Sequence, residues 1–296
     1  MNSETKITVI GAGGAGGRAI NHLMTKGMDD ISFVAADTDP QDLEKSQAPS
    51  TFLLHSHSND EELTALISAS DFLCVIAGMG GRSAIKIVKF ITQIAAKHGV
   101  QTITILSAPF RFEGWNRRKR AQRCIEHLEK TVDSLVLLNN PKLQILHPSV
   151  TSPTALFQCA NEYFYQIISA FHGLLQPGIL TVDLADISAM TKQKGAVFVG
   201  FGRDENLSVA TEAALYSLLL DDISIPESQV MLVQFSSTAN HSLLDIHQAM
   251  LFIQDHAHED VNIIFGWTVD EVAGDSVSVT IFASDLLSSF AHPLQE

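Results

Sequence analysis

The sequence of 296 residues has little of what marks secreted, membrane-spanning or zinc-stabilised proteins. Its three cysteines, Cys74, Cys124 and Cys159, are scattered and odd in number, which indicates neither a disulfide framework nor a zinc site. The longest apolar runs, such as residues 71–77, are far shorter than the roughly 20 residues of a membrane-spanning helix. Residues 1–10 lack the basic region and apolar core of a signal peptide, so we expect a cytoplasmic protein.

Basic residues are also scarce. Lys and Arg number 19 against 33 Asp and Glu, which gives a formal net charge of −14 with His neutral. Sequence-independent nucleic-acid binders take their affinity from neutralising phosphates, so this composition argues against a nucleic-acid partner. The 46% of hydrophobic residues is typical of a globular chain and unlike a disordered one.

The order of apolar runs predicts two domains around one long helix. In residues 1–151, β-rich runs alternate with helical patterns, which predicts a Rossmann-like α/β domain with a parallel sheet and helices on both faces. Pro153 follows a serine N-cap and opens a long central helix over residues 152–176, which Pro177 ends. The mixture of helices and closely spaced strands in residues 177–296 predicts a smaller α+β domain.

A glycine-rich turn follows the first predicted strand and opens a helix. Glycines let the backbone approach a phosphate, and a helix N-terminus offers free N–H groups and the positive end of its dipole. The pattern fits GxGxxG, and Asp37 closes the next strand. Taken alone, this is the fingerprint of an NAD- or FAD-type dinucleotide binder. The glycines are Gly11, Gly13, Gly14, Gly16 and Gly17.

A second glycine turn weakens the dinucleotide interpretation. Gly78, Gly80 and Gly81 follow the strand at residues 72–77, and parallel strands place both turns at the same carboxyl edge of the sheet. Two neighbouring glycine turns suit a ligand with several phosphates better than the single pyrophosphate of a dinucleotide. The loop at residues 107–114 follows a further strand and reaches the same edge.

A set of short segments resembles FtsZ, the bacterial division family of the tubulin superfamily. The resemblance identifies the chain as a divergent FtsZ-like protein. It implies GTP or GDP binding in the N-terminal domain, Mg²⁺ with GTP, and head-to-tail polymers in which an acidic loop of the next subunit completes the hydrolytic site. The segments keep the family's order and spacing along nearly the whole chain, at residues 7–17, 35–41, 77–81, 109–114, 132–134 and 182–186.

The guanine end of the implied site is retained. By the resemblance, Asn140 contacts the nucleotide, Phe157 stacks on the base, and Asn161 reads its edge. Phe157 and Asn161 are four residues apart and share one helix face, which ordinary helix packing also explains. Glu113 and Arg117 match a ribose-side acid and a phosphate-side arginine of the family.

The phosphate end departs from the family. Where the family has GGGTGTG, residues 80–86 read GGRSAIK, which loses glycines and a threonine hydroxyl, and Arg82 either clamps a phosphate or fills an empty pocket. The loop expected to cover the γ-phosphate is shortened within residues 44–70. We interpret His55 and His57 in this segment as part of a solvated loop, and we predict no metal site.

Asp183 and Asp186 match the carboxylates that polarise the attacking water in the family. The alternative is purely structural, since Asp183 is a good N-cap and Asp186 could complete a capping box. Thr181 replaces a family asparagine, which weakens the catalytic interpretation.

Basic side chains cluster in one segment of this acidic chain. They could face a triphosphate, anionic lipid or the acidic surface of a partner, or simply form a solvated helix face. The residues are Arg111, Arg117, Arg118, Lys119, Arg120 and Arg123.

Together these observations predict a protein that self-assembles head to tail into filaments, with guanine-nucleotide binding and GTPase activity weak or lost. Its expected partners are further copies of itself and authentic FtsZ. The alternatives are an active GTP-hydrolysing polymer whose catalytic aspartates come from the next subunit and, third, an NAD-type dinucleotide binder.

Overall fold

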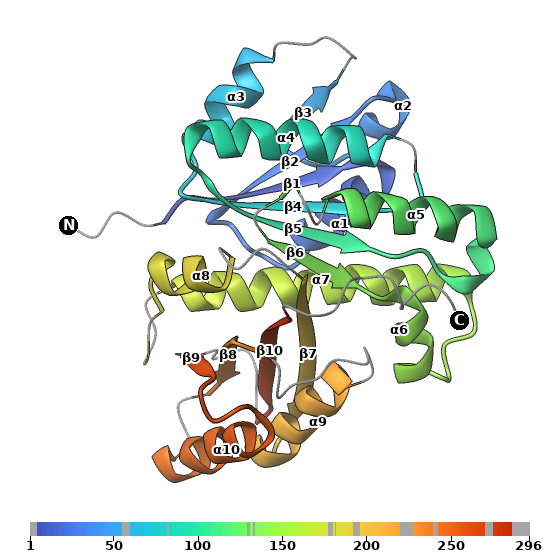
Figure 1. Ribbon diagram of the computed structural model, residues 1–296. Coiled ribbons are helices and arrows are strands. Elements are labelled where there is room, and N and C mark those ends of the chain that lie inside the picture. Colours follow the sequence, from blue (N-terminus) through green and yellow to red (C-terminus); the bar gives the residue numbers. More distant parts are fainter. Residues whose placement is uncertain are drawn as a thin grey trace. The chain divides into compact units, whose positions relative to one another are not determined.

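The computed structural model divides the chain into two compact units, Met1–Tyr165 and Gln166–Ser289 (Figure 1). The structure describes residues 5–54, 60–81, 83–128, 131–132, 134–176, 180, 182–191, 196–219, 228–238, 242–269 and 275–285.

The described part of the first unit is built on a parallel sheet in the order β3-β2-β1-β4-β5-β6. The inner strands read as almost continuous apolar runs because helices cover both faces of the sheet. The strands are β1 (Ile7–Ala12), β2 (Ile31–Asp37), β3 (Ser50–Leu53), β4 (Phe72–Gly78), β5 (Gln101–Ser107) and β6 (Leu135–Leu138).

The strand order reverses between β1 and β4, and this reversal positions the site. From β1 the chain moves outward through β2 to β3, and from β4 it moves the other way through β5 to β6. Since crossover connections are right-handed, helix α1 covers one face while α3, α4 and α5 cover the other. Ligands of such sheets bind at the carboxyl edge where the order reverses. The helices of this unit are α1 (Gly13–Met24), α2 (Pro40–Leu43), α3 (Glu61–Ser68), α4 (Ala84–His98), α5 (Trp115–Leu128), α6 (Asn140–Leu146) and the first half of α7 (Pro153–Leu175), with a 3₁₀ turn at Arg111–Glu113.

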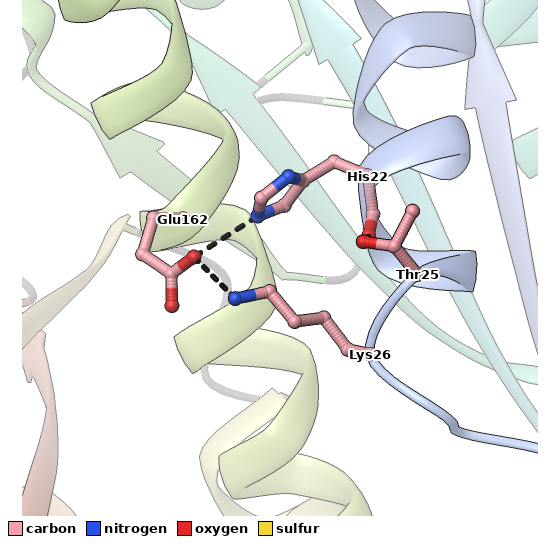
Figure 2. Close-up of polar contacts among 4 residues, drawn as sticks. All are labelled: His22, Thr25, Lys26 and Glu162. Carbon is pink, nitrogen blue, oxygen red and sulfur yellow. Dashed lines mark hydrogen bonds and ion pairs between the residues drawn. The ribbon is translucent and has the colours of Figure 1, made fainter.

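Helices α1 and α7 are joined by a small ion-pair cluster (Figure 2). Glu162 Oε2 of α7 lies 3.0 Å from Nε2 of His22, in the last turn of α1, and 2.8 Å from Nζ of Lys26, just after that helix. Partial burial alone would raise the pKa of Glu162, but the hydrogen bonds and charges of Lys26 and His22 outweigh it and lower the pKa. The charged pair therefore fixes α1 against α7.

The described part of the second unit contains a mixed sheet in the order β7-β10-β8-β9. Strand β10 is antiparallel to β7 and β8, whereas β8 and β9 are parallel. Phe171, in the second half of α7, packs on Phe282 of β10 with ring centroids 4.3 Å apart. The elements are α8 (Leu184–Thr191), β7 (Ala196–Asp204), α9 (Leu207–Leu219), β8 (Val230–Ser237), α10 (Leu243–His256), β9 (Asn262–Val269) and β10 (Val277–Asp285).

The predicted fold class is confirmed: a parallel-sheet α/β domain, a long helix and a smaller α+β domain. Two local expectations were wrong. The segment 44–70 is not simply a shortened loop, because it contains β3 and α3. The glycine turn is also tighter than predicted, since α1 already begins at Gly13. Among the helices of the described segments, none combines the length and hydrophobicity that crossing a bilayer requires.

Candidate functional site

A pocket of about 260 Å³ opens at the carboxyl edge of the first unit's sheet. It lies where β1 and β4 end, at the reversal of strand order, and its walls come from segments far apart in the sequence. Many residues singled out from the sequence line it together: Gly13, Gly14, Gly78, Gly80, Gly81, Glu113, Arg117, Asn140, Phe157 and Asn161. Arg82, which was expected either to clamp a phosphate or to fill an empty pocket, lies outside the described residues, as do His55 and His57.

Three predicted glycines do not line the pocket. Gly11 and Gly16 instead let α1 pack directly on the sheet, because a Cβ on Gly16 would lie 2.6 Å from the Ile76 carbonyl oxygen and one on Gly11 2.5 Å from the Gly16 carbonyl oxygen. Gly17 has open space where a Cβ would stand. Gly13 is the residue that needs its conformational freedom, since its φ is 74°.

Two helix N-termini reach the pocket without side-chain caps. Helix α1 begins after Ala12, and α4 begins after Ser83, whose side chain makes no capping hydrogen bond. Both residues line the pocket. The first N–H groups of each helix have no partner within the helix and carry the positive end of the helix dipole. The pair of turns is therefore suited to an anionic ligand.

Glu113 and Arg117 form an oriented pair at the pocket wall. The two carboxylate oxygens of Glu113 accept separate hydrogen bonds, one from the Phe110 backbone N–H at 2.8 Å and one from Arg117 Nη1 at 2.5 Å. Arg117 in turn passes over the second glycine turn, where a Cβ on Gly80 would lie 3.2 Å from its Nε. The guanidinium retains free N–H donors for a phosphate.

Asn140 is a buried polar group whose acceptor is unpaired. It is 4% exposed, it lines the pocket at the start of α6, and its Oδ1 has no hydrogen-bond partner. A buried unsatisfied oxygen carries a free-energy cost of about 1–3 kcal/mol. A ligand N–H donor placed in the pocket would remove that cost.

Phe157, Ala160, Asn161 and Phe164 bring one face of α7 into the pocket. The Phe157 ring meets Phe110 edge-on at 5.3 Å, and Phe110 stacks on Phe112 at 5.1 Å. An apolar ring beside an amide offers stacking area and hydrogen-bond groups for a heterocyclic base.

Sequence reasoning missed two charged residues of the pocket. Arg18 of α1 and Asp42 of α2 both line it. Asp42 lies close over the first glycine turn, because a Cβ on Gly14 would be 2.8 Å from its Oδ2, while its Oδ1 lies 3.0 Å from Lys45 Nζ. Its proximity to the turn comes from the packing of α2 on α1, which residue spacing alone does not reveal.

Asp37, the acidic residue of the dinucleotide fingerprint, does not line the pocket. It is 3% exposed and accepts hydrogen bonds from the backbone N–H groups of Thr38 and Asp39 at 2.6 and 3.2 Å. Burial raises its pKa, although these hydrogen bonds oppose the shift. It is not among the pocket-lining residues, so it has the geometry of a turn-stabilising group rather than a ribose ligand.

Asp183 and Asp186 belong to the second unit and cap α8 reciprocally. The Asp186 N–H donates to Asp183 Oδ1 at 2.8 Å, and the Asp183 N–H donates to Asp186 Oδ2 at 3.3 Å. This is the capping box that the sequence allowed as the structural alternative. Both residues retain some solvent exposure, so the capping role and a role toward another subunit are compatible.

Comparison with protein families agrees with both units. Residues 55–147 match the model of the Tubulin/FtsZ family GTPase domain, and residues 195–287 match the model of the FtsZ family C-terminal domain. The chain is 31% identical to the cell division protein FtsZ of Helicobacter pylori, with 94% of this chain and 79% of the relative covered. It is 29% identical to FtsZ of Magnetospirillum gryphiswaldense over 97% of this chain, and it spans 55% of that relative's length.

A solved structure supports the same fold assignment. An empty FtsZ dimer from M. jannaschii superposes with a TM-score of 0.86 at 27% identity, covering 97% of this chain and 90% of the other.

Proposed function

Since the chain belongs to the FtsZ family of the tubulin superfamily, we propose that it binds guanine nucleotide in the described pocket and assembles head to tail into filaments, with GTP hydrolysis weak or lost. Asn140 carries the binding part of the proposal. Its buried Oδ1 has no partner in the protein, and a nucleotide N–H or hydroxyl would supply one.

The base end of the pocket supports guanine recognition. Asn161 provides an amide with both donor and acceptor atoms, and Phe157 provides a ring held in place by Phe110. The uncapped starts of α1 and α4 and the guanidinium of Arg117 support phosphate binding opposite. In this arrangement the residues of the chain bind and orient the nucleotide.

The residues at the phosphate end of the pocket support the proposal that GTP hydrolysis is weak. The Asp42 carboxylate lies close over the first glycine turn and opposes further negative charge there. In the second turn Ser83 keeps a hydroxyl, but Ala84 and Ile85 stand where the family has a glycine and a threonine. A divalent cation such as Mg²⁺ would offset the repulsion from Asp42 when a triphosphate binds.

The alternative is an active polymer in which the next subunit supplies Asp183 and Asp186. Their positions at the start of α8 and their partial exposure favour this alternative. An NAD-type binder is less well supported, because Asp37 bonds its own turn and does not line the pocket.

The nucleotide content of the purified protein tests whether the pocket binds guanine nucleotide. We expect guanine nucleotide on chromatography of the extract, or stoichiometric uptake of GDP or GTP by the emptied protein. The Asn140→Ala variant should bind more weakly. A pocket that rejects guanine nucleotides, or that takes NAD in preference, would overturn the proposal.

Co-sedimentation tests whether the protein assembles with itself and with authentic FtsZ. The protein alone should form pelletable filaments. Mixed with authentic FtsZ, it should change the amount of polymer pelleted. Its failure to pellet alone or with FtsZ, over a range of concentrations, would contradict assembly.

A further inference from the structure

Helix α5 carries a cationic outer face that the pocket does not use. Its buried residues Ala121, Ile125 and Leu128 face the sheet, so the opposite side faces solvent. Helical spacing places Trp115, Lys119 and Arg123 in one exposed stripe, at positions i, i+4 and i+8. Arg120 lies next to this stripe and is also exposed.

The structure separates the basic segment into two groups. Arg117 turns to the pocket and pairs with Glu113, and Arg118 is half-buried with its guanidinium 5.3 Å from the Trp115 ring centroid. The outward group consists of Lys119, Arg120 and Arg123. None of these three forms an ion pair with another residue of the described segments.

The neighbouring helix α4 carries further basic side chains. His127, near the end of α5, lies 2.7 Å from Lys89 of α4, which fixes the two helices side by side (Figure 1). Lys86 is exposed one turn earlier on α4. Glu126 is the single acidic residue of α5, and it accepts a hydrogen bond from Gln122 at 3.0 Å.

Two exposed aromatic side chains lie at and shortly before the N-terminal end of α5. Trp115 is 57% exposed and Phe112 is 48% exposed. Aromatic rings beside lysines and arginines are typical of surfaces that rest at a bilayer interface, where the ring enters the headgroup region and the cations meet anionic lipids.

We propose that the outer face of α5, formed by Trp115, Lys119, Arg120 and Arg123, docks on an anionic lipid bilayer. The net charge of −14 does not prevent this, because charges beyond a screening length of about 8 Å contribute little at physiological salt. It does orient the protein, since this face offers cations that form no ion pair within the described segments, beside an exposed aromatic ring, to a negative surface.

Tryptophan fluorescence reports the docking directly. The chain has two tryptophans, and Trp267 is 4% exposed and donates a hydrogen bond to Ser237 at 3.0 Å. A change on adding vesicles therefore reports Trp115. With vesicles of phosphatidylcholine containing about one third phosphatidylglycerol, we expect a blue shift and co-sedimentation, both lost at high salt. Vesicles of phosphatidylcholine alone should give neither.

Matched variants separate local docking from net charge. Arg120→Ala with Arg123→Ala should weaken partitioning to anionic vesicles roughly 25-fold, about fivefold for each charge. Lys97→Ala with Arg203→Ala removes the same charge elsewhere and should bind like the wild type. Trp115→Phe should lose the fluorescence signal and keep most of the co-sedimentation. Equal binding to neutral vesicles, no vesicle binding, or equal loss in both double variants would overturn the proposal.

Discussion

Glu113 holds Arg117 over the second glycine turn through a direct ion pair, while its other carboxylate oxygen accepts the Phe110 N–H. One carboxylate thus links the aromatic end of the pocket to its phosphate end. Because Glu113 is largely buried and Arg117 half exposed, the carboxylate is the fixed partner and the guanidinium the adjustable one. Arg117 can therefore keep this bond while it reaches a phosphate.

Replacing Glu113 by Gln should weaken nucleotide binding. The neutral amide holds Arg117 less firmly, so we expect about a five- to tenfold loss of affinity, which corresponds to about 1 kcal/mol. Calorimetry with GDP measures it. Arg117→Lys is the matched control, since it keeps the charge and loses the fork geometry. Unchanged affinity in both variants would show that the pair does not serve the ligand.

Asn140→Ala should affect binding and stability differently. Binding should weaken about tenfold or more because a hydrogen bond to the ligand is lost. The free energy of unfolding of the nucleotide-free protein should stay within about 1 kcal/mol of the wild type, because the removed oxygen was unsatisfied. Urea denaturation and nucleotide titration give the two values. A large loss of stability with normal affinity would indicate a structural residue.

Asp42→Asn should strengthen triphosphate binding. Removing the carboxylate over the first glycine turn relieves repulsion, and we expect about a two- to fivefold gain for GTP and a smaller gain for GDP. The difference should shrink at high salt, since Asp42 is partly exposed. Competition between GTP and GDP measures it, with Asp39→Asn as a control that keeps the N-cap of α2. Weaker GTP binding by Asp42→Asn would contradict this account.

Glu162→Gln should make stability less dependent on pH in the acid range. The folded-state pKa of Glu162 is lowered, so its stabilisation is present above the unfolded-state pKa, near 4.3, and is lost as pH falls through the folded-state value. At pH 7 the variant should be less stable by about 0.5–1 kcal/mol, since the pair is partly exposed. The difference should fade below about pH 4. An equal deficit at pH 3.5 and pH 7 would rule out the ion pair as its cause.

Two substitutions of Asp183 separate its role as the N-cap of α8 from the role of its charge. Asp183→Ala should destabilise α8 by about 1 kcal/mol, whereas Asp183→Asn should keep the cap, because both Asn and Asp are good N-cap residues. Thermal denaturation of the two variants checks this. Equal destabilisation by Asn and Ala would show that charge, rather than capping, holds this turn.

The alternation of strands and helices allowed the parallel sheet and the pocket edge to be predicted, whereas β7 does not follow from its local pattern. Gly200 and Gly202 interrupt its apolar pattern. A Cβ at these positions would lie 2.1 Å from the Ala214 carbonyl oxygen and 1.8 Å from that of Ala210. The glycines therefore serve the close packing of α9 on β7, a tertiary requirement that the local pattern does not reveal.

Motif spacing allowed many of the pocket-lining residues to be predicted. It did not reveal that Asp42 reaches the pocket, or that the basic side chains of residues 111–123 face two different surfaces. Asp42 reaches the glycine turn through the packing of α2 on α1. Arg117 and Arg120 are one turn apart in sequence, yet one turns to the pocket and the other to solvent. Which side chains of a helix serve which surface depends on how the helix is rotated on the sheet.

Phosphate release from pelleted polymer, measured for the wild type beside Asp183→Asn, tests the central claim most directly. The account predicts that both proteins pellet and that both release phosphate from GTP slowly or not at all, at indistinguishable rates. Rapid release by the wild type that Asp183→Asn abolishes, while polymer still forms, would contradict it and establish the active GTPase.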